Sequence, residues 1–353
     1  PGSPCSIGIS RAWTRRALAT SPEEEIVDFL ALTLAGILSA GAPLVLATLG
    51  ETLTERAGVI NLSLDGTILL AAMTAFALAY VSGNPWLGLL GSIAVGMATA
   101  SIVALMGPIL GRSQLAVGFI LTLLCRDLAY FLGHPYARQF GPELPVWSIP
   151  GVRDLPFIGP ILGYQSPVVY LSLVLTAFLW WWLFSTRGGL EVRAVGEEPW
   201  AAFARGIKVQ RLRIMYTLLG GALVGLAGGA FSLAVKPGWG RPQGAEGAGW
   251  IALAIVIFGG WHPLRAALGA YLFATLQVLG IYLAEQFPGL PAPLFQVAPF
   301  PVMILTLLLV NVGSTGWFQD LAFRYPGMKR WLSRWQVTAP AALGQDFRPE
   351  REI

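Results

Sequence analysis

The feature that most constrains this chain is the recurrence of apolar runs about 20 residues long. A run of this length, folded as a helix, crosses the roughly 30 Å hydrocarbon core of a bilayer. About nine runs occur, at residues 26–50, 62–82, 86–111, 114–133, 167–184, 214–236, 248–262, 264–286 and 294–313. The sequence therefore predicts an all-α, polytopic bundle of about nine transmembrane helices, some of them short or broken.

Composition supports a lipid environment. Hydrophobic residues make up 55% of the 353 residues and charged residues 12%, against about 45–50% and about 25% in soluble domains. A water-exposed surface would need far more charge than this chain carries. The run at 248–262 is the shortest, and it ends in Gly259-Gly260-Trp261-His262-Pro263. We expect this run to be tilted, broken or paired with the next one.

Basic residues indicate which loops face the cytoplasm. The loop at 185–213 carries six arginines or lysines against three glutamates, and the positive-inside rule places it in the cytoplasm. Alternation then places the loops at 134–165, 237–247 and 287–293 outside. The proline-rich loop at 134–165 is either an ordered connector or a gate over the solute path. On the same count the N-terminal tail lies outside, in spite of its three arginines.

The domain organisation follows from these runs. We expect an N-terminal tail over residues 1–25, a transmembrane domain over 26–313 and a cytoplasmic C-terminal tail over 314–353. The first tail lacks the order of a signal peptide, because three glutamates separate its arginines from the first apolar run. The net charge is +4, and the basic residues gather in short segments beside the apolar runs. Basic residues in such segments set the orientation of a membrane protein, so no nucleic-acid partner is predicted.

Enzymatic chemistry is not indicated. The two histidines, His134 and His262, are far apart and each precedes a proline, so they offer neither a zinc motif nor a local catalytic triad. Two cysteines supply too few ligands for a thiolate metal site. No segment matches the phosphate-binding pattern GxxxxGK[ST]. We therefore predict no catalytic residue, no metal, no cofactor and no binding of ATP through a P-loop of this chain.

Two polar segments interrupt the apolar pattern. Residues 51–66 contain two glycines and several polar groups between two apolar runs, which favours a broken helix beside a water-filled path. The alternative is an ordinary loop in which Glu55 pairs with Arg56 and Asp65 caps the next helix. Residues 193–207 predict a short cytoplasmic helix that opens at Pro199 and ends at Gly206. Such a helix either docks in a groove of a partner protein or is a solvated connector.

Polar residues within the apolar runs are the third candidate group. They are Gln114, Thr122, Arg126, Asp127, Gln277 and Glu285. Ionisable side chains in hydrocarbon cost about 2.5–3.5 kcal/mol each, so they face a bundle interior or water. We interpret Arg126 and Asp127 as structural residues near an interface. Thr122 and Gln277, nearer the centres of their runs, are better candidates for a pore.

Three segments carry a resemblance to a known family. Residues 55–66 (ERAGVINLSLDG) are similar to ERAGVxNLGxEG, residues 193–207 (RAVGEEPWAAFARGI) to RAVGENPxAAxxAGI, and residues 250–264 (WIALAIVIFGGWHPL) to GFIALAxVIFGRWNPLGA. These patterns are found in the permease subunits of bacterial ABC importers of the nucleoside and simple-sugar type, relatives of ribose and branched-chain amino acid permeases. The likeness extends over roughly residues 30–312.

The resemblance implies a multi-pass permease subunit in the inner (plasma) membrane, with a pathway for nucleosides or related small polar solutes. Besides membrane lipid, its implied partners are two ATP-binding subunits or a fused ATPase, a second permease that forms a heterodimer, and an external solute-binding lipoprotein. The implied translocation pathway, together with the pore candidates above, comprises Asn61, Ser63, Asp65, Thr122 and Gln277. The implied contact with the ATPase comprises Glu198, Ala201, Ala202, Arg205 and Gly206.

Four positions depart from the family patterns. Ser63 stands where glycine is usual, Asp65 where glutamate is usual, and Thr122 and His262 where asparagine is expected. These departures leave the solute open, and a sugar or branched-chain amino acid permease is the alternative. A different class, an ion-driven secondary transporter, would use Asp65, Asp127 or Glu285 as relays. A non-transporting membrane scaffold would leave the short cytoplasmic helix unexplained.

Overall fold

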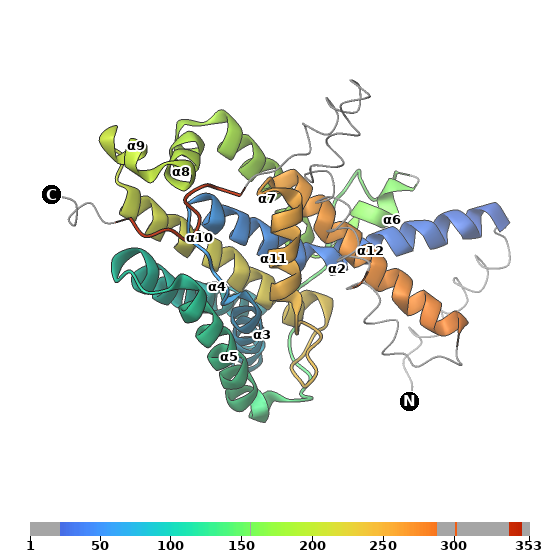
Figure 1. Cartoon of the computed structure of the whole chain (residues 1–353). Coiled ribbons are helices and arrows are strands. Elements are labelled where there is room, and N and C mark those ends of the chain that lie inside the picture. The colour runs from blue at the N-terminus through green and yellow to red at the C-terminus, as the bar shows by residue number, and fades with distance from the viewer. Residues whose placement is uncertain (1–21, 156, 288–300, 302–338, 348–353) are drawn as a thin grey trace, which may run out of the picture.

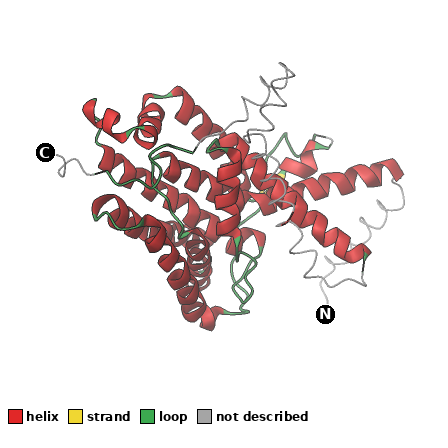
Figure 2. Ribbon diagram, viewed as in Figure 1, coloured by secondary structure: helices red, strands yellow, loops and turns green. Residues whose placement is uncertain are grey.

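The computed structural model describes residues 22–155, 157–287, 301 and 339–347. It is a bundle of α-helices (Figures 1 and 2). The long helices are α2 (Pro22–Arg56), α3 (Leu64–Ser82), α4 (Pro85–Ala104), α5 (Gln114–Gly133), α7 (Pro167–Ser185), α10 (Val209–Ala230) and α12 (Pro263–Gln286). The shorter ones are α6 (Ile158–Leu162), α8 (Arg187–Glu197), α9 (Pro199–Ala204) and α11 (Ala248–Gly259).

Irregular elements extend or join these helices. The π-helical turns η1 (Leu105–Ile109) and η3 (Phe231–Val235) continue α4 and α10, and a 3-10 turn, η2 (His134–Tyr136), follows α5. Two strands of two residues each, β1 (Trp147–Ser148) and β2 (Tyr164–Gln165), pair antiparallel with Trp147 opposite Gln165. The proline-rich loop thus contains only short elements, as its composition predicts.

The predicted all-α membrane bundle is confirmed. Seven helices in the described part of the chain are long and apolar enough to cross a membrane. The run at 248–262 forms the 12-residue helix α11, which is shorter than a span. The ninth predicted run, 294–313, lies outside the described residues except for residue 301, as do most of the two predicted tails. A count of nine spans is therefore not established.

Local sequence explains where the helices begin and end. Gly83, at φ 69°, ends α3 in the left-handed region, where glycine has no side-chain penalty. The side chain of Asn84 then accepts a hydrogen bond from Trp86 N at 2.9 Å, and Pro85 occupies the first helical position of α4. Two residues therefore suffice to turn the chain between α3 and α4.

Helices α3 and α10 lie at the centre of the bundle. Of their most apolar stretches 72% and 61% is buried, against 28% for α5, which packs mainly on α3. The α10 helix contacts α4, α2 and α3. A Cβ atom added at Gly96 of α4 would lie 2.1 Å from the carbonyl oxygen of Gly221 on α10. Small residues therefore bring these backbones together, as is common in membrane helix packing.

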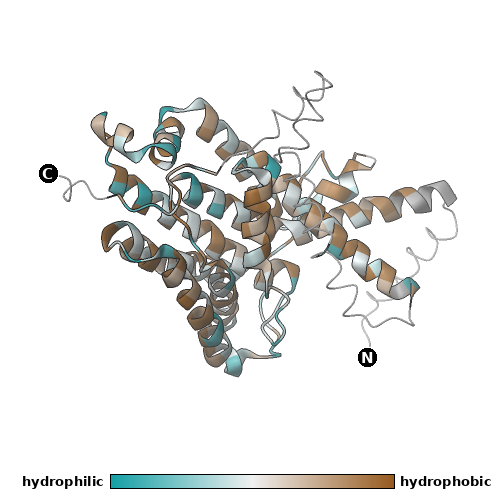
Figure 3. Ribbon diagram, viewed as in Figure 1, coloured by the Kyte–Doolittle hydropathy of each residue, from teal (hydrophilic) through white to brown (hydrophobic). Residues whose placement is uncertain are grey.

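One end of the bundle carries α8 and α9, and we call it the α9 end (Figure 1). Hydrophilic residues are prominent on α8 and at the start of α10, whereas hydrophobic residues predominate along the long helices (Figure 3). Residues 339–347, which we call the C-terminal strap, cross this end between α8, α10 and the end of α2. The strap returns the chain to the junction between α2 and α3.

Candidate solute path and its cytoplasmic end

The junction of α2 and α3 is a break of seven residues, 57–63, between two apolar helices. Gly58, its second residue, has φ 85° and donates its N–H to Glu55 O at 2.9 Å. The predicted break is confirmed, but it is shorter than expected because Glu51 to Arg56 continue α2. Backbone groups freed inside a bundle need partners from neighbouring elements.

Four backbone groups of the break find partners on three different elements. Ile60 N donates to Gln114 Oε1 at 2.8 Å, and Leu62 O accepts from Thr122 Oγ1 at 2.6 Å, so α5 holds two of them. On the other side, Asn61 N donates to Glu51 Oε1 of α2 at 3.3 Å. Gly58 O accepts from N of Gly344, in the C-terminal strap, at 3.0 Å. The irregular backbone is therefore fixed in place by side chains and by the strap.

A chain of buried amide and hydroxyl groups starts at the break. Asn61 Oδ1 accepts from Ser63 Oγ at 2.6 Å and from Ser63 N at 3.1 Å. Thr67 Oγ1 lies 3.3 Å from Ser63 Oγ and 3.1 Å from Thr99 Oγ1 of α4. None of these four side chains is more than 5% exposed. Such groups can exchange hydrogen bonds with the hydroxyl and amide groups of a polar solute.

Asp65 lies where two helices begin. It is the second residue of α3, and its Oδ1 accepts from Gly249 N, in the first turn of α11, at 3.2 Å. A carboxylate is favourable at a helix N-terminus because the unpaired N–H groups there carry partial positive charge. A Cβ atom at Gly249 would lie 2.2 Å from Asp65 N. Asp65 does not cap its own helix, as the alternative interpretation had it, but joins α3 to α11.

Two carboxylates missed as candidates lie on α2, one helical turn apart. Glu51 is fully buried, and its Oε2 has no hydrogen-bond partner among the described residues. Glu55, 4% exposed, accepts a hydrogen bond from Trp261 Nε1, which follows α11. Glu55 and Arg56 therefore do not pair with each other. The role of Glu55 depends on a residue 206 positions away in sequence, so no local pattern indicates it.

The link between α11 and α12 contacts the end of α2 through Trp261 and the end of α7 through His262. Arg56 donates from Nε to Trp261 O at 2.9 Å and forms an ion pair with Glu197 at 3.8 Å. His262 stacks on Phe184 with ring centroids 4.9 Å apart. Burial lowers the pKa of His262 below its ordinary value of 6.5, and the nearby guanidinium groups of Arg265 and Arg56 lower it further. His262 is therefore neutral at neutral pH.

The loop that precedes α11 is organised by Glu246. Its Oε1 accepts from Tyr130 of α5 and from Gln243 N at 2.7 Å, and its Oε2 accepts from Gly244 N at 2.6 Å. Burial raises the pKa of Glu246, but these hydrogen bonds together hold it below its ordinary value. The guanidinium of Arg241 lies 4.7 Å from the centre of the Tyr130 ring. A charged, hydrogen-bonded loop thus joins α5 to the start of α11.

The outer face of α5 is unusual for a membrane helix. Arg126 and Asp127 lie near the middle of the span Gln114–Tyr136, and their side chains are 46% and 72% exposed. They pair with each other at 3.4 Å. Exposed charges at mid-span face water or another protein, because contact with lipid would be costly. The expected position of these two residues near an interface of the membrane stays a prediction.

Four of the five predicted pathway residues come together. Asn61, Ser63, Asp65 and Thr122 lie along the break and the face of α5 that covers it. Gln277 is exposed on α12, which packs on α2, α7 and α11, and the structure does not bring it to this group. Gln114, Glu51, Thr67 and Thr99 join the group through the hydrogen bonds given above.

The predicted short helix at residues 198–206 is present as α9. Pro199 opens it, and Gly206, at φ 84°, follows its end. Glu198, Ala201, Arg205 and Gly206 are exposed, but Ala202 is 3% exposed and packs inward on Phe347 of the strap. The preceding residues 187–197, expected as loop, form the amphipathic helix α8.

Sequence comparison identifies relatives of this chain. Residues 33–307 match the family model described as the branched-chain amino acid transport system permease component. A protein of Haloferax volcanii, provisionally named as a glucose ABC transporter permease, is 37% identical over 72% of this chain and 78% of its own length. A guanosine ABC transporter permease of Bacillus subtilis is 32% identical, and a nucleoside ABC transporter permease of Lactococcus lactis is 30% identical.

Each of the last two alignments covers 80% of this chain and 93% of the relative. No solved structure matches the chain significantly. The predicted resemblance to ABC importer permeases, drawn from three short motifs, is confirmed over most of the sequence. The chain is a multi-pass membrane protein that belongs to the family of branched-chain amino acid transport system permease components.

Proposed function

We propose that this chain is the permease subunit of an ATP-binding-cassette importer that carries nucleosides across the inner (plasma) membrane. The observation that carries the proposal is the buried chain of amide and hydroxyl groups from Asn61 to Thr99, next to Asp65. The ribose hydroxyls and base amides of a nucleoside offer matching donors and acceptors. Relatives named for guanosine and nucleoside transport support this choice of solute.

A sugar is the second candidate solute. The relative named for glucose transport is 37% identical to this chain, and a sugar ring presents the same hydroxyl chemistry as ribose. The two solutes differ in the planar base, which needs an apolar or aromatic surface for stacking. Tyr130, partly buried beside the Glu246 loop, offers such a surface.

We further propose that the α9 end is cytoplasmic and that α9 contacts the ATPase. The basic segment around α8 and α9 supports the orientation. The exposed residues Glu198, Ala201, Arg205 and Gly206 would lie in the groove of the ATPase, whereas Ala202 would hold α9 from inside. ATP hydrolysis then belongs to two ATP-binding subunits or a fused one, and an external lipoprotein delivers the solute.

A second, different permease completes the conduit in this proposal. The exposed charges of Arg126 and Asp127 at mid-span of α5 need a face that is not lipid. In Lactococcus lactis a second nucleoside ABC transporter permease also matches this chain, at 28% identity over 110 residues. Two permeases of one substrate class in one organism support a heterodimer, with the α5 face turned toward the conduit.

Reconstitution with the partner proteins tests the function. Uptake of labelled guanosine, glucose and leucine into proteoliposomes is measured with ATP, and again with a gradient but without the ATPase. We expect ATP-dependent uptake of guanosine that unlabelled nucleosides inhibit more strongly than glucose or leucine. Uptake driven by an ion gradient alone would point to the secondary transporter instead, and preference for glucose would assign the sugar.

A further inference from the structure

The C-terminal strap is attached to the break between α2 and α3. Its Gly344 donates a backbone hydrogen bond to Gly58 O at 3.0 Å. The next residue, Gln345, accepts at its carbonyl oxygen from Nη1 of Arg213 at 2.7 Å, and Arg213 is fully buried. Charge-assisted hydrogen bonds to a buried guanidinium are stronger than neutral ones. This part of the strap is therefore held firmly against the break.

The same strap is attached to α8 and α9. Ala342 N donates to Gly196 O at 2.9 Å, and Ala341 N donates to Glu197 Oε2 at 3.2 Å. At its far end Phe347, 2% exposed, packs on Val195, Ala202 and Val209. Its ring centroid also lies 4.6 Å from that of Trp200 and 5.6 Å from that of Phe203. Within nine residues, the strap thus contacts both the break and the α9 helix.

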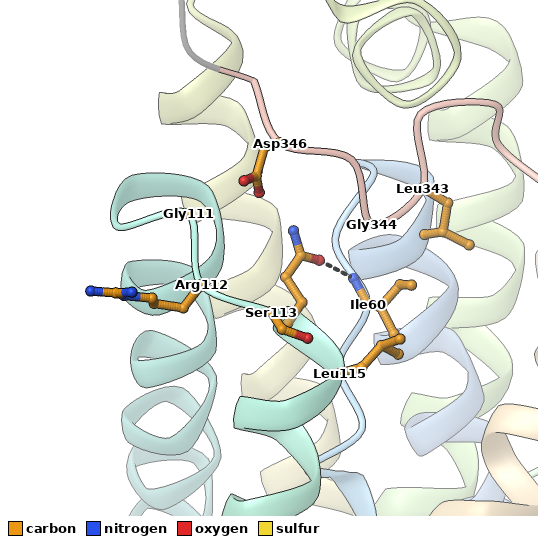
Figure 4. A pocket seen from close by; sticks show the side chains of 9 residues that line it. Ile60, Gly111, Arg112, Ser113, Leu115, Leu343, Gly344 and Asp346 are labelled. Atoms are coloured by element: carbon orange, nitrogen blue, oxygen red, sulfur yellow. Dashed lines mark hydrogen bonds between the residues drawn. The ribbon is translucent and has the colours of Figure 1, made fainter.

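A cavity lies between the strap and the break. Its volume is about 350 Å³, and Ile60, Gln114, Leu343, Gly344 and Asp346 are among the residues that line it. Figure 4 shows Leu343 and Gly344 over Ile60, with the carboxylate of Asp346 turned toward the same space. Gln114 Nε2 is buried without a hydrogen-bond partner among the described residues. A shift of the strap would change the shape of this cavity directly.

An ion pair that joins α8 to the end of α2 is weaker than the contacts of the strap. The ion pair between Arg56 and Glu197 has a separation of 3.8 Å, and the Glu197 side chain is 47% exposed, so it contributes little. The strap, in contrast, contributes backbone hydrogen bonds and a buried aromatic ring. A packed element that contacts two sites can carry energetic coupling between them. The strap is such an element.

We propose that the C-terminal strap transmits displacement of α9 to the break, with Phe347 as the positioning residue on the α9 side. The inference rests on the proposed function, because displacement of α9 by an ATPase is its starting point. When α9 moves, Phe347 moves with it and displaces the strap. The displacement is transmitted to Gly58 through its hydrogen bond with Gly344. The solute path then opens or closes at the cavity below the strap. Phe347 touches no solute and acts only through the strap.

The test compares two activities in the same proteoliposomes, using the assembled complex. Phe347→Ala removes the ring from the α9 cluster, and Phe140→Ala is the matched control, because Phe140 is 99% exposed. We expect Phe347→Ala to hydrolyse ATP on addition of solute-loaded binding protein as the unaltered chain does. Its ratio of guanosine uptake to ATP hydrolysed should fall by about fivefold or more, and Phe140→Ala should keep the ratio.

A second variant and a rescue make the test decisive. Phe347→Leu keeps a buried apolar group but loses the ring contacts, so its ratio should fall less, and it serves if the alanine variant does not assemble. Ala341→Cys and Glu197→Cys, joined by a short bifunctional thiol reagent with Cys5 and Cys125 replaced by serine, should restore the ratio in Phe347→Ala. A merely structural role for Phe347 would not be rescued by this link.

The outcomes separate the strap from the proposed function. If the complex with the unaltered chain moves no solute, the proposed function fails and the strap has nothing to transmit. If that complex transports guanosine, and Phe347→Ala or Phe347→Leu transports it with an unchanged ratio of uptake to hydrolysis, the strap proposal is overturned. A lowered ratio that the cross-link does not restore overturns it as well.

Discussion

At the scale of single residues, the break between α2 and α3 depends on partners for its freed backbone groups. Thr122 has the shortest of these contacts, 2.6 Å to Leu62 O, and Gln114 and Glu51 hold the neighbouring N–H groups. Each partner therefore both fixes the shape of the path and contributes a polar group next to it. Stability and transport are expected to change together at these positions.

Thr122 offers the cleanest test of this dependence. Thr122→Val keeps the shape of the side chain but leaves Leu62 O without its donor, which should cost about 1–3 kcal/mol of unfolding free energy. Thr122→Ser should retain most of the stability. Thr74→Val is the control, because Thr74 Oγ1 bonds Leu70 O within its own helix, and its effect should stay within about 0.5 kcal/mol. Denaturant unfolding in detergent gives the comparison, and equal losses for both valine variants would contradict it.

His262 gives a prediction about pH. Its folded-state pKa lies below 6.5, because burial and the charges of Arg265 and Arg56 disfavour the protonated ring. The unfolded chain therefore takes up a proton before the folded one does as the pH falls. This contribution to stability is present above about pH 6.5 and is lost below it. Asparagine, the residue expected from the family pattern, does not titrate.

Thermal unfolding of the two forms checks the sign. Midpoints are measured about one pH unit above and below 6.5 for the unaltered chain and for His262→Asn. The unaltered chain should lose more of its melting temperature on acidification than the variant does. The same loss in both forms would show that His262 is not the group responsible.

The sequence was sufficient to predict the break and four polar residues at or beside it, Asn61, Ser63, Asp65 and Thr122. Motifs and composition can be read from short stretches of sequence, which is why these four could be predicted. It missed Glu51, which is fully buried on α2, and it missed the contact of Glu55 with Trp261, 206 positions away. The fifth predicted pathway residue, Gln277, is exposed on α12 and does not join the other four, so its role stays a prediction. Position along a span does not tell which face of the helix points inward when both faces are apolar.

At the scale of elements, the path depends on two helices, α3 and α11, that begin next to each other. The α11 helix starts at Ala248, and Asp65 near the start of α3 accepts the N–H of Gly249. Helix α5 covers the same point from the other side. Close approach needs glycine, since a Cβ atom at Gly66 would lie 2.1 Å from Thr122 O. Broken helices whose ends meet inside a bundle are a known way to build a polar site in a membrane protein.

Gly66→Ala tests this close approach. The added methyl group would meet backbone atoms of α5, which cannot move aside as a flexible side chain can, so we expect a loss of about 1–3 kcal/mol or more. Gly36→Ala is the matched control on α2, since no atom lies within 4 Å of the added Cβ. It should be neutral or stabilising by up to about 1 kcal/mol. Similar unfolding curves for the two variants would contradict the packing described.

The boundaries of elements were predictable only where the chain marks them. Pro199 and Gly206 mark α9, and the structure agrees with both. No glycine or proline lies between Glu51 and Arg56, so α2 continues one and a half turns beyond the predicted end of its apolar run. Residues 187–197 were expected as loop because they are charged, but one face of α8 packs through Val192 and Val195. Tertiary packing decided both cases.

At the scale of the whole molecule, we propose that this chain forms one half of a conduit and that the second permease forms the other half. The polar groups at the break line it from within, and the charged face of α5 turns toward the second permease. The strap joins this region to α9. An importer built in this way exposes the α5 face to water, while a face such as that of α7 meets lipid. The two faces are similarly exposed in the isolated chain, so only the membrane distinguishes them.

Labelling of single cysteines in the assembled importer tests this claim most directly. Asp127→Cys and Val174→Cys, each in a chain with Cys5 and Cys125 replaced by serine, are matched in exposure, since the unaltered side chains are 72% and 64% exposed. A charged thiol reagent reacts only where water ionises the cysteine. We predict that Asp127→Cys is labelled, that guanosine slows its labelling, and that Val174→Cys is not labelled. Equal protection of both cysteines would contradict a water-filled path along α5.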